Sequence, residues 1–231
     1  MSEAIVDQLR TNPRSKWLDV WQEFRNHKGA VVGAIIFIAI ALIVLFGPFF
    51  WPYEPNGIDI RNRNQGPTFA HPLGTDQLGR DTFARIMTGG RTSIFVGLTA
   101  MLLSLSLGTT IGVLSGFFKK LDGALMRFTD LFLSLPLLPL LLVMMLLFRE
   151  PLSSTFGPER GMFILIVVSI GITSWMPTAR IVRGDVLAIK EREFILAARS
   201  IGGSDTKIIF RHILPNVLSP IMVSATLGIA N

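Results

Sequence analysis

The sequence contains no cysteine and few charged residues, and these two absences narrow what the chain can be. Without cysteine, disulfide bonds, iron–sulfur clusters and thiol chemistry are excluded. Only 16% of the 231 residues are Asp, Glu, Lys or Arg, whereas a soluble protein carries about a quarter. Half of the residues are hydrophobic, and the mean hydropathy is +0.52. This composition favours a membrane protein.

Catalytic motifs are absent as well. The chain has no Gly-x-x-x-x-Gly-Lys-Ser/Thr phosphate-binding loop, no HExxH zinc motif and no Gly-x-Ser-x-Gly nucleophile turn. His71 stands near Asp76 and Asp81 in the sequence, but one histidine with scattered carboxylates is a weak metal signal. We interpret these residues as part of a hydrogen-bonded turn. No catalytic residue, metal site or cofactor is predicted.

The chain is basic, with a formal net charge of +6, but this charge does not indicate a nucleic-acid-binding protein. The basic residues cluster at the ends of apolar runs rather than along one amphipathic face. Orientation in a bilayer explains such placement, because Lys and Arg are enriched on the cytoplasmic side of membrane proteins. No nucleic-acid partner is predicted.

Long runs without charged residues divide the chain into predicted membrane spans. They cover residues 29–53, 92–118, 131–148, 161–179 and 216–231. A transmembrane helix needs about 20 predominantly apolar residues, so the last run is short for a complete span. We therefore expect four spans and the beginning of a fifth.

The basic residues also predict the orientation of the chain. Fifteen of the 22 Lys and Arg residues lie in residues 1–28, in the turn after the second run and in residues 180–215. The positive-inside trend places these three segments in the cytoplasm. The N-terminus is thus predicted to be cytoplasmic, and the polar stretch 54–91 to be extracytoplasmic.

A short amphipathic helix is predicted within the N-terminal segment 1–28. Trp17, Trp21 and Phe24 recur there at positions i, i+4 and i+7. Since Trp rings favour the membrane interface, we expect this helix to lie on the lipid surface. Packing against another helix of the protein is the alternative, and both can hold. The span 29–53 that follows carries little polarity and is predicted to be a peripheral anchor.

Two of the later runs indicate how their helices are built. Gly108, Gly112 and Gly116 recur every four residues and form a small-residue ridge, which predicts close helix packing rather than ligand binding. Pro136 and Pro139 lie inside the run 131–148. Because proline removes a backbone donor and clashes with the preceding turn, a kink or a broken helix is expected there.

Residues 180–215 form a basic loop between two predicted spans. The stretch from Glu193 to Gly202 is rich in good helix formers and predicts a short helix. Gly202-Gly203 is expected to end this helix, and Ser204 or Asp205 to cap a second one. One apolar face of the first helix is predicted from the three- and four-residue spacing of Phe194, Ile195, Ala198 and Ile201.

This loop resembles the EAA loop of ABC importer permeases. In that family an Ala-Ala pair is followed four residues later by Gly and further on by an Ile-x-Leu-Pro ending. Here Ala197-Ala198, Gly202 and Leu214-Pro215 stand at those offsets. Leu196 replaces the Glu before the Ala pair, so the nearest acid is Glu193, and His212 replaces the Ile. The alternative is a basic loop that lies on anionic lipid.

A second segment, His71 to Asp81, is similar to the stretch that precedes the transport core in dipeptide and oligopeptide permeases. The resemblance implies an all-α, polytopic membrane helical bundle in the bacterial inner (plasma) membrane. Its ABC importer type I permease-like core, residues 92–231, would be preceded by one extra N-terminal span.

The resemblance also implies partners and functional residues. The chain would be a permease subunit that forms half of a translocation pathway for peptides, with ATP hydrolysed in a separate subunit. Its partners would be a second homologous permease subunit, two ATPase subunits, an extracytoplasmic substrate-binding protein and membrane lipid. The ATPase-coupling residues would be Glu193, Ala197, Ala198, Arg199 and Gly202. Candidate pathway residues are Ser134, Ser169, Thr173 and Ser174, although hydroxyls in spans also bond to their own backbone.

Two other classes of function fit the sequence less well. A secondary transporter would need buried charges at the span centres, and the predicted spans carry none. A membrane scaffold subunit would not need a loop that couples it to an ATPase, such as residues 180–215. Within the resembled family, related systems carry peptides, nickel chelates and some sugars. The resemblance implies a further span after the last run, and only 16 residues follow Pro215, so we expect a truncated chain.

Overall fold

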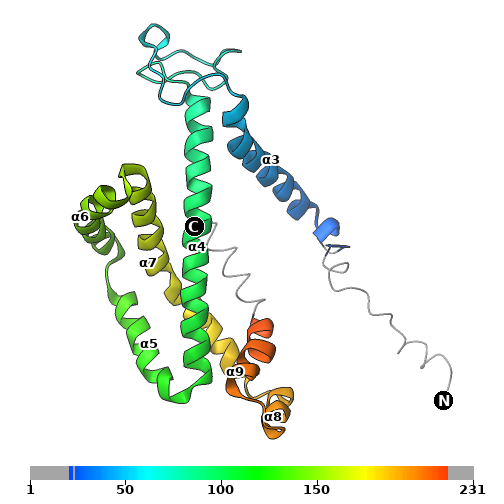
Figure 1. Ribbon diagram of the computed structural model, residues 1–231. Helices are drawn as coiled ribbons and strands as arrows, with labels where there is room; N and C mark the ends of the chain where they lie inside the picture. Colours follow the sequence, from blue (N-terminus) through cyan, green and yellow to red (C-terminus); the bar gives the residue numbers. More distant parts are fainter. Residues whose placement is uncertain (1–20, 23, 218–231) are drawn as a thin grey trace, which may run out of the picture. The chain divides into compact units, whose positions relative to one another are not determined.

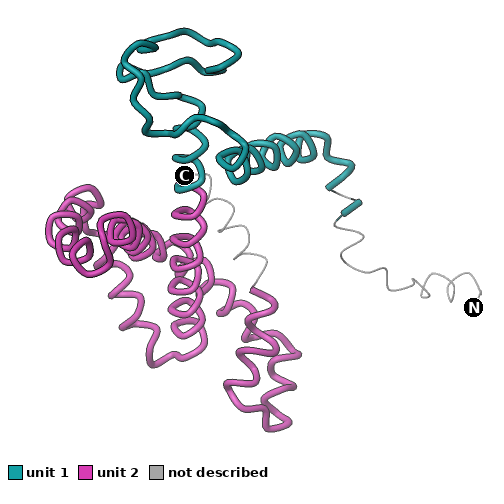
Figure 2. The backbone as a smooth tube through the Cα atoms, turned by 45° about the horizontal axis from the view of Figure 1, so that its top comes forward, with its two compact units in different colours: residues 1–92 teal, residues 93–231 magenta. Residues whose placement is uncertain are grey.

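The computed structural model describes residues 21–22 and 24–217, and the regular elements within these residues are all helices (Figure 1). The predicted all-α class is confirmed. The expected amphipathic helix around Trp17 lies mostly outside the described residues. The run 216–231 also lies outside them, apart from its first two residues. The chain divides into two compact units, residues 1–92 and 93–231, with the boundary inside one long helix (Figure 2).

Unit 1 contains helix α3 (Lys28–Phe50), the polar segment 51–81 and the first turns of α4 (Thr82–Phe117). The His27 side chain accepts a hydrogen bond from the Ala30 amide and begins α3. Along α3 only Val44 is buried, where it lies against Gly90 of α4. An apolar helix exposed on nearly every side matches a span surrounded by lipid.

Up to residue 217, where the described part ends, unit 2 holds the rest of α4 and six further elements. They are α5 (Lys119–Ser134), α6 (Leu137–Phe156), α7 (Pro158–Ile189), α8 (Glu193–Ser200), α9 (Asp205–Ile208) and the π-helix η2 (Ile209–Ile213). Among the described residues, four helices are long and apolar enough to cross a membrane: α3, α4, α6 and α7. Figure 1 shows α8 and α9 at the same end of unit 2 as the turn between α4 and α5.

The expected break in the third run lies at Leu135–Pro136, between α5 and α6. Both residues have extended backbone angles, and Pro136 is the residue from which α6 begins. The structure thereby differs from a span over 131–148, because residues 131–134 belong to the amphipathic α5. The apolar helix that could cross the membrane begins at Leu137 instead.

Helix α4 packs closely against α7 through the predicted glycine ridge. A Cβ atom at Gly108 would come within 2.7 Å of the Trp175 carbonyl oxygen, and one at Gly112 within 2.7 Å of the Ala179 carbonyl oxygen. A Cβ atom at Gly116 would come within 2.7 Å of the Val186 Cβ atom. The ridge is therefore a helix-packing surface, as its spacing indicated. Ala179, Val182 and Val186 on the facing side of α7 are fully buried.

We predict that Gly112→Ala separates α4 from α7. The added methyl group would meet backbone rather than a flexible side-chain end, so the helices must shift, at a cost of about 1–3 kcal/mol. Thermal unfolding in detergent should show a lower midpoint. Gly97→Ala, in the same helix but with nothing within 4 Å of its Cβ position, is the control and should be neutral or stabilising. Equal midpoints for the two variants would contradict a packing role for the ridge.

Candidate functional site

The loop after α7 folds as its residues predict. Glu193 in the first turn of α8 and Arg199 in the last turn both oppose the helix dipole. The helix ends where Gly202 adopts a φ of 81°, and the Gly203 amide then donates to the Ala198 carbonyl at 2.9 Å. The Ser204 hydroxyl accepts from the Lys207 amide and caps α9. The predicted stop at Gly202-Gly203 and the cap by Ser204 are confirmed.

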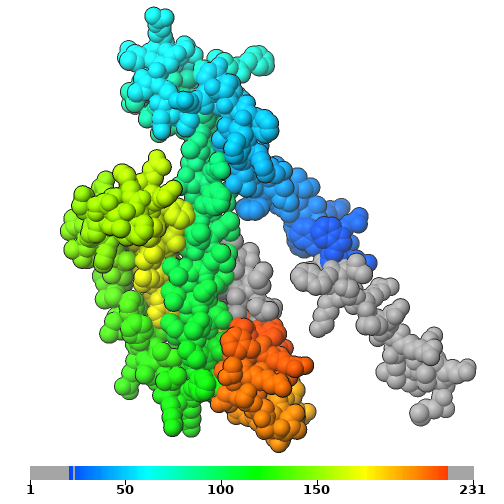
Figure 3. All heavy atoms as spheres, in the orientation of Figure 1, coloured from blue at the N-terminus to red at the C-terminus, as the bar shows by residue number. Residues whose placement is uncertain are grey.

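One side of this loop is anchored in the hydrophobic core of unit 2. Ile195 of α8, Ile208 of α9 and Ile213 of η2 are all buried. They share one cluster with residues of α4 and α7, namely Val113, Phe117, Val182 and Val186. Ala198 is half-buried against the same cluster. The loop is therefore attached to the ends of both helices through apolar contacts, and Figure 3 shows it lying against the end of α4.

The predicted apolar face of α8 is only partly buried. Ile195 and Ala198 point inward, but the side chains of Phe194 and Ile201 are 45% and 87% exposed. The four positions span about 120° of the helix circumference, but the core of unit 2 covers only the side of this arc that carries Ile195 and Ala198, and Ile201 follows the last helical residue. Together with Leu196 and Ala197, the two exposed residues form a second apolar surface, which we call the outer face of α8.

The structure separates the five predicted coupling residues into two groups. Glu193, Ala197 and Gly202 are exposed. Ala198 contacts the core of its own chain, and the Arg199 guanidinium lies 5.2 Å from the centre of the Phe117 ring at the end of α4. This cation–π contact attaches α8 to α4. Ala198 and Arg199 are thus placed to hold α8 on its own subunit.

A polar cluster beside α8 was missed by the sequence reasoning. The Arg183 guanidinium of α7 donates from two nitrogens to the two Asp122 carboxylate oxygens of α5, at 2.5 and 2.7 Å. The hydrogen bonds from Arg183 lower the pKa of Asp122, and the Lys190 charge adds to this effect. The Lys190 ammonium also donates to the Gly116 carbonyl of α4 at 3.0 Å. Asp122 and Arg183 are far apart in sequence, so no local signal pairs them.

The four candidate pathway residues do not share one environment. The Ser134 hydroxyl of α5 donates to the Leu131 carbonyl, and the Thr173 hydroxyl of α7 to the Ser169 carbonyl. Ser169 is buried within the unit, whereas Ser134 and Ser174 are exposed. A residue that lines a pathway has to be reachable from outside its own unit. This requirement favours Ser134 and Ser174, and their role stays a prediction.

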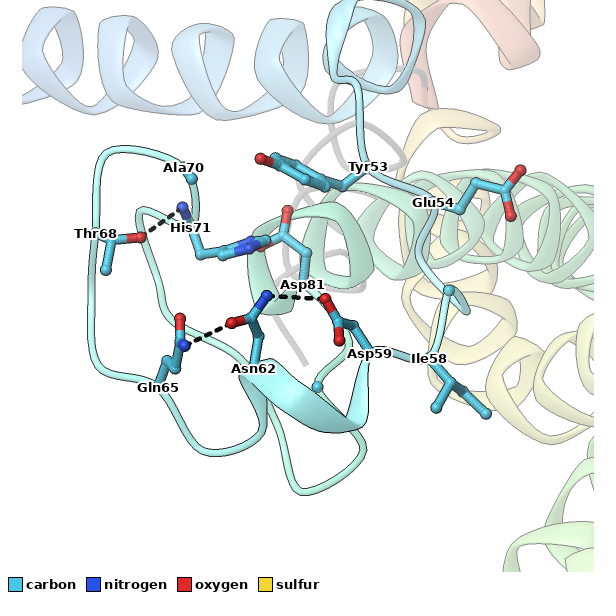
Figure 4. A pocket seen from close by; sticks show the side chains of 12 residues that line it. Tyr53, Glu54, Ile58, Asp59, Asn62, Gln65, Thr68, Ala70, His71 and Asp81 are labelled. Atoms are coloured by element: carbon cyan, nitrogen blue, oxygen red, sulfur yellow. Dashed lines mark hydrogen bonds and ion pairs between the residues drawn. The ribbon is translucent and has the colours of Figure 1, made fainter.

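The segment 51–81 of unit 1 folds into turns around a polar pocket of about 500 Å³ (Figure 4). The Thr68 and Gly74 amides both donate to the His71 carbonyl at 2.9 Å, so the predicted hydrogen-bonded turn is confirmed. Asp81 is buried and accepts from the Trp51 indole at 2.5 Å and from the Ala84 amide at 3.3 Å. Asp81 thereby joins the end of α3 to the start of α4.

Asp76 is the hydrogen-bonding centre of the same segment. Its carboxylate accepts from the Arg80 side chain at 2.8 Å, from the Arg85 side chain at 2.6 Å and from the Leu78 and Arg80 amides. The side-chain hydrogen bond from Arg80 is the largest cause that lowers the pKa of Asp76, to about 2 from an ordinary 3.8. Ionised Asp76 therefore organises the turn between residues 76 and 80.

We predict that segment 51–81 loosens when the pH falls from about 4 toward 2. A carboxyl group whose pKa is lowered by folding stabilises the folded form above its unfolded pKa, and this stability is lost as pH falls through the folded value. The hydrogen-exchange protection factors of the amides in residues 59–81, which compare each observed rate with the intrinsic rate at the same pH, should therefore fall over this interval.

The Asp76→Asn variant should exchange faster than the parent protein at neutral pH and lose most of the acid-dependent change. Glu54→Gln, at an exposed position in the same segment, is the control and should keep the parent's pH profile. A parent profile that persists in Asp76→Asn would show that another group titrates.

Sequence comparisons place the chain among known proteins. Residues 108–231 match the family described as "Binding-protein-dependent transport system inner membrane component", and residues 15–67 match "N-terminal TM domain of oligopeptide transport permease C". The chain is 36% identical over 225 residues to the oligopeptide transport system permease protein OppC of Bacillus subtilis, covering 97% of this chain and 70% of that protein.

Other relatives with similar identity are also named as peptide permease proteins. The dipeptide transport system permease protein DppC of Alkalihalophilus pseudofirmus is 35% identical over 215 residues, covering 93% of this chain and 67% of the relative. A putative peptide permease protein of Brucella abortus is 37% identical over 209 residues, covering 90% of this chain and 66% of the relative. The chain spans about two thirds of the length of these relatives. With its four candidate spans it is a multi-pass membrane protein, and it belongs to the family of binding-protein-dependent transport system inner membrane components.

Proposed function

We propose that this chain is the transmembrane permease subunit of an ATP-driven peptide importer, and that the outer face of α8 docks on a separate ATPase subunit. The observation that carries the proposal is the two-sided construction of α8. Ile195 is buried in the core of unit 2, while Phe194 and Leu196 beside it are 45% and 47% exposed. The names of the relatives support peptides as the transported substrate.

The outer face of α8 fits a protein partner better than lipid. Three of its apolar residues, Phe194, Leu196 and Ala197, stand between Glu193 and Arg199, and the loop carries seven basic residues that the positive-inside trend places in the cytoplasm. Apolar side chains held in water on a short helix are typical of a helix that inserts into a groove of a partner. Ala197, in the middle of this face, lets the helix approach such a groove closely.

The proposed partners follow from the family. Two ATPase subunits would bind the coupling loops of this chain and of a second, homologous permease subunit. A substrate-binding protein would deliver peptides on the extracytoplasmic side. In this arrangement the N-terminus is cytoplasmic and the chain lies in the plasma membrane, in contact with lipid. Residues 180–215 form the coupling loop, of which 180–189 continue α7.

The mechanism we propose uses the loop as a lever. ATP binding brings the two ATPase subunits together and displaces α8. Because Ile195 shares a buried cluster with Phe117 of α4 and Val186 of α7, a displacement of α8 acts directly on the ends of both helices. The spans then turn outward and accept peptide from the binding protein. ATP hydrolysis returns them to the inward-facing arrangement.

We predict that Ala197→Asp uncouples transport from ATP hydrolysis. The change puts a charge at the centre of the outer face, where docking would bury it without a partner. Peptide uptake and the stimulation of ATPase activity by the loaded binding protein should both fall, roughly tenfold or more for a loss of about 2 kcal/mol in docking.

The matched control is Ala124→Asp, the same change at an exposed alanine of α5, which should leave both rates near those of the parent. Membrane insertion, followed by the amount of chain in the membrane fraction, should be normal for both variants. Normal uptake by an inserted and assembled Ala197→Asp transporter would rule out the outer face as the docking surface.

We also predict that Gly202→Val misplaces α8 without disturbing the core. Nothing lies within 4 Å of the Gly202 Cβ position, so the effect comes from the φ of 81°, which costs a β-branched residue roughly 1–2 kcal/mol. Stimulated ATPase activity should fall by a smaller factor than in Ala197→Asp. Gly184→Val, at an exposed glycine of α7 with open space and no positive φ, is the control. Equal activity of the two valine variants would show that the turn at Gly202 tolerates a side chain.

A further inference from the structure

The ends of three helices meet beside α8 in a set of polar contacts that we call the polar clamp. It consists of Asp122 at the start of α5, Arg183 on α7, Lys190 directly after α7, and the Gly116 carbonyl at the end of α4. Arg183 and Lys190 are seven residues apart, close to two helical turns, so they lie on one side of α7. All four residues belong to unit 2.

The contact between α5 and α7 is fixed in direction as well as distance. Two parallel hydrogen bonds from a planar guanidinium to one carboxylate allow little rotation about the pair. The Arg183 and Asp122 side chains are 32% and 26% exposed, so water screens this pair less than it screens a fully exposed one. Asp122 also lies in the first turn of α5, where a negative charge is favoured by the helix dipole.

The contact between α7 and α4 completes the clamp. The Lys190 ammonium donates to the Gly116 carbonyl, one residue before α4 ends at Phe117. The last carbonyls of a helix have no partner within the helix, and a cation there satisfies both the hydrogen bond and the dipole. Phe117, the next residue, carries Arg199 of α8 over its ring. The clamp and α8 therefore meet at the same helix end.

We propose that Asp122, Arg183 and Lys190 are positioning residues that make the ends of α4, α5 and α7 move together with α8. The inference rests on the proposed function, in which α8 is displaced by the ATPase. Apolar contacts attach α8 to α4 and α7, and Arg183 extends this attachment to α5 through Asp122. The break at Leu135–Pro136 lets α5 turn without a continuous helix connecting it to α6.

The same two helices provide a matched control pair. Arg180 of α7 contacts Asp130 of α5 at 2.5 Å, but through one nitrogen, and the side chains are 53% and 59% exposed. Exposed single contacts of this kind contribute little, because water screens them and both side chains lose freedom. A clamp function therefore predicts a strong effect for Arg183 and a weak one for Arg180.

The test measures the distance between α5 and α8 in the complete transporter. The chain contains no cysteine, so spin labels can be attached at Lys120→Cys and Ser200→Cys, both exposed positions, with cysteine-free partner subunits. Pulsed electron paramagnetic resonance should give the same narrow distance distribution with and without bound ATP. Arg183→Gln and Asp122→Asn should broaden the distribution and make it depend on ATP, whereas Arg180→Gln should leave it unchanged.

Activity provides the second measurement. ATPase stimulation by the binding protein should fall roughly fivefold in Arg183→Gln and Asp122→Asn, a typical size for a lost coupling between sites. Arg183→Lys keeps the positive charge but loses the pair of parallel hydrogen bonds that a guanidinium makes. Its ATPase stimulation should therefore lie between that of Arg183→Gln and that of the parent. Ala197→Asp separates the two proposals, because it tests docking while leaving the clamp intact.

Three results would overturn the clamp. The distance distribution could stay narrow and independent of ATP in both Arg183→Gln and Asp122→Asn. Arg180→Gln could change it as much as Arg183→Gln does. Both clamp variants could fail to accumulate in the membrane, which would make the pair a folding contact only. If Ala197→Asp has no effect on stimulation, the proposed function fails, whatever the clamp variants show.

Discussion

The close contact between α4 and α7 is the interaction on which unit 2 depends. In lipid, apolar side chains gain nothing by leaving the solvent, so helices associate through dispersion contacts and hydrogen bonds that require near approach. Gly108, Gly112 and Gly116 make that approach possible, since a side chain at any of them would collide with α7. The hydrophobic cluster that buries Ile195 of α8 includes residues of both helices. The Lys190 ammonium, directly after α7, also donates to a carbonyl of α4. Without the glycine ridge neither could assemble.

Much of this fold could be predicted because its signals are local. Charge-free runs, the break before α6 and the stop at Gly202 each follow from a few neighbouring residues. The orientation of α8 could not, because eight residues with apolar side chains on both sides fit either orientation. Tertiary contacts with Phe117 and Val186 decide that Ile195 and Ala198 turn inward. The pairing of Asp122 with Arg183 also depends on how α5 and α7 pack, which no spacing in the sequence specifies.

In the segment His71 to Asp81, the residues that resemble the peptide permeases are the ones that its local structure requires. Asp76 collects hydrogen bonds from two arginines, and Asp81 caps α4 while it accepts from Trp51 at the end of α3. A side chain at Gly79, where φ is 74°, would collide with the backbone of Asp59. Each of these residue types is required by the turn in which it stands. The resemblance in this segment is therefore explained by folding alone.

A short helix transmits force only when its attachment is stiffer than its contact with a partner. In α8 the attachment consists of Ile195 in a closely packed cluster and Arg199 over the Phe117 ring. Packed interiors respond to a push by moving as a body rather than by deforming. The outer face, in contrast, is exposed and free to bind and release. An amphipathic helix with one apolar face could be anchored or could dock, but it could not do both, and the two apolar faces of α8 meet both requirements.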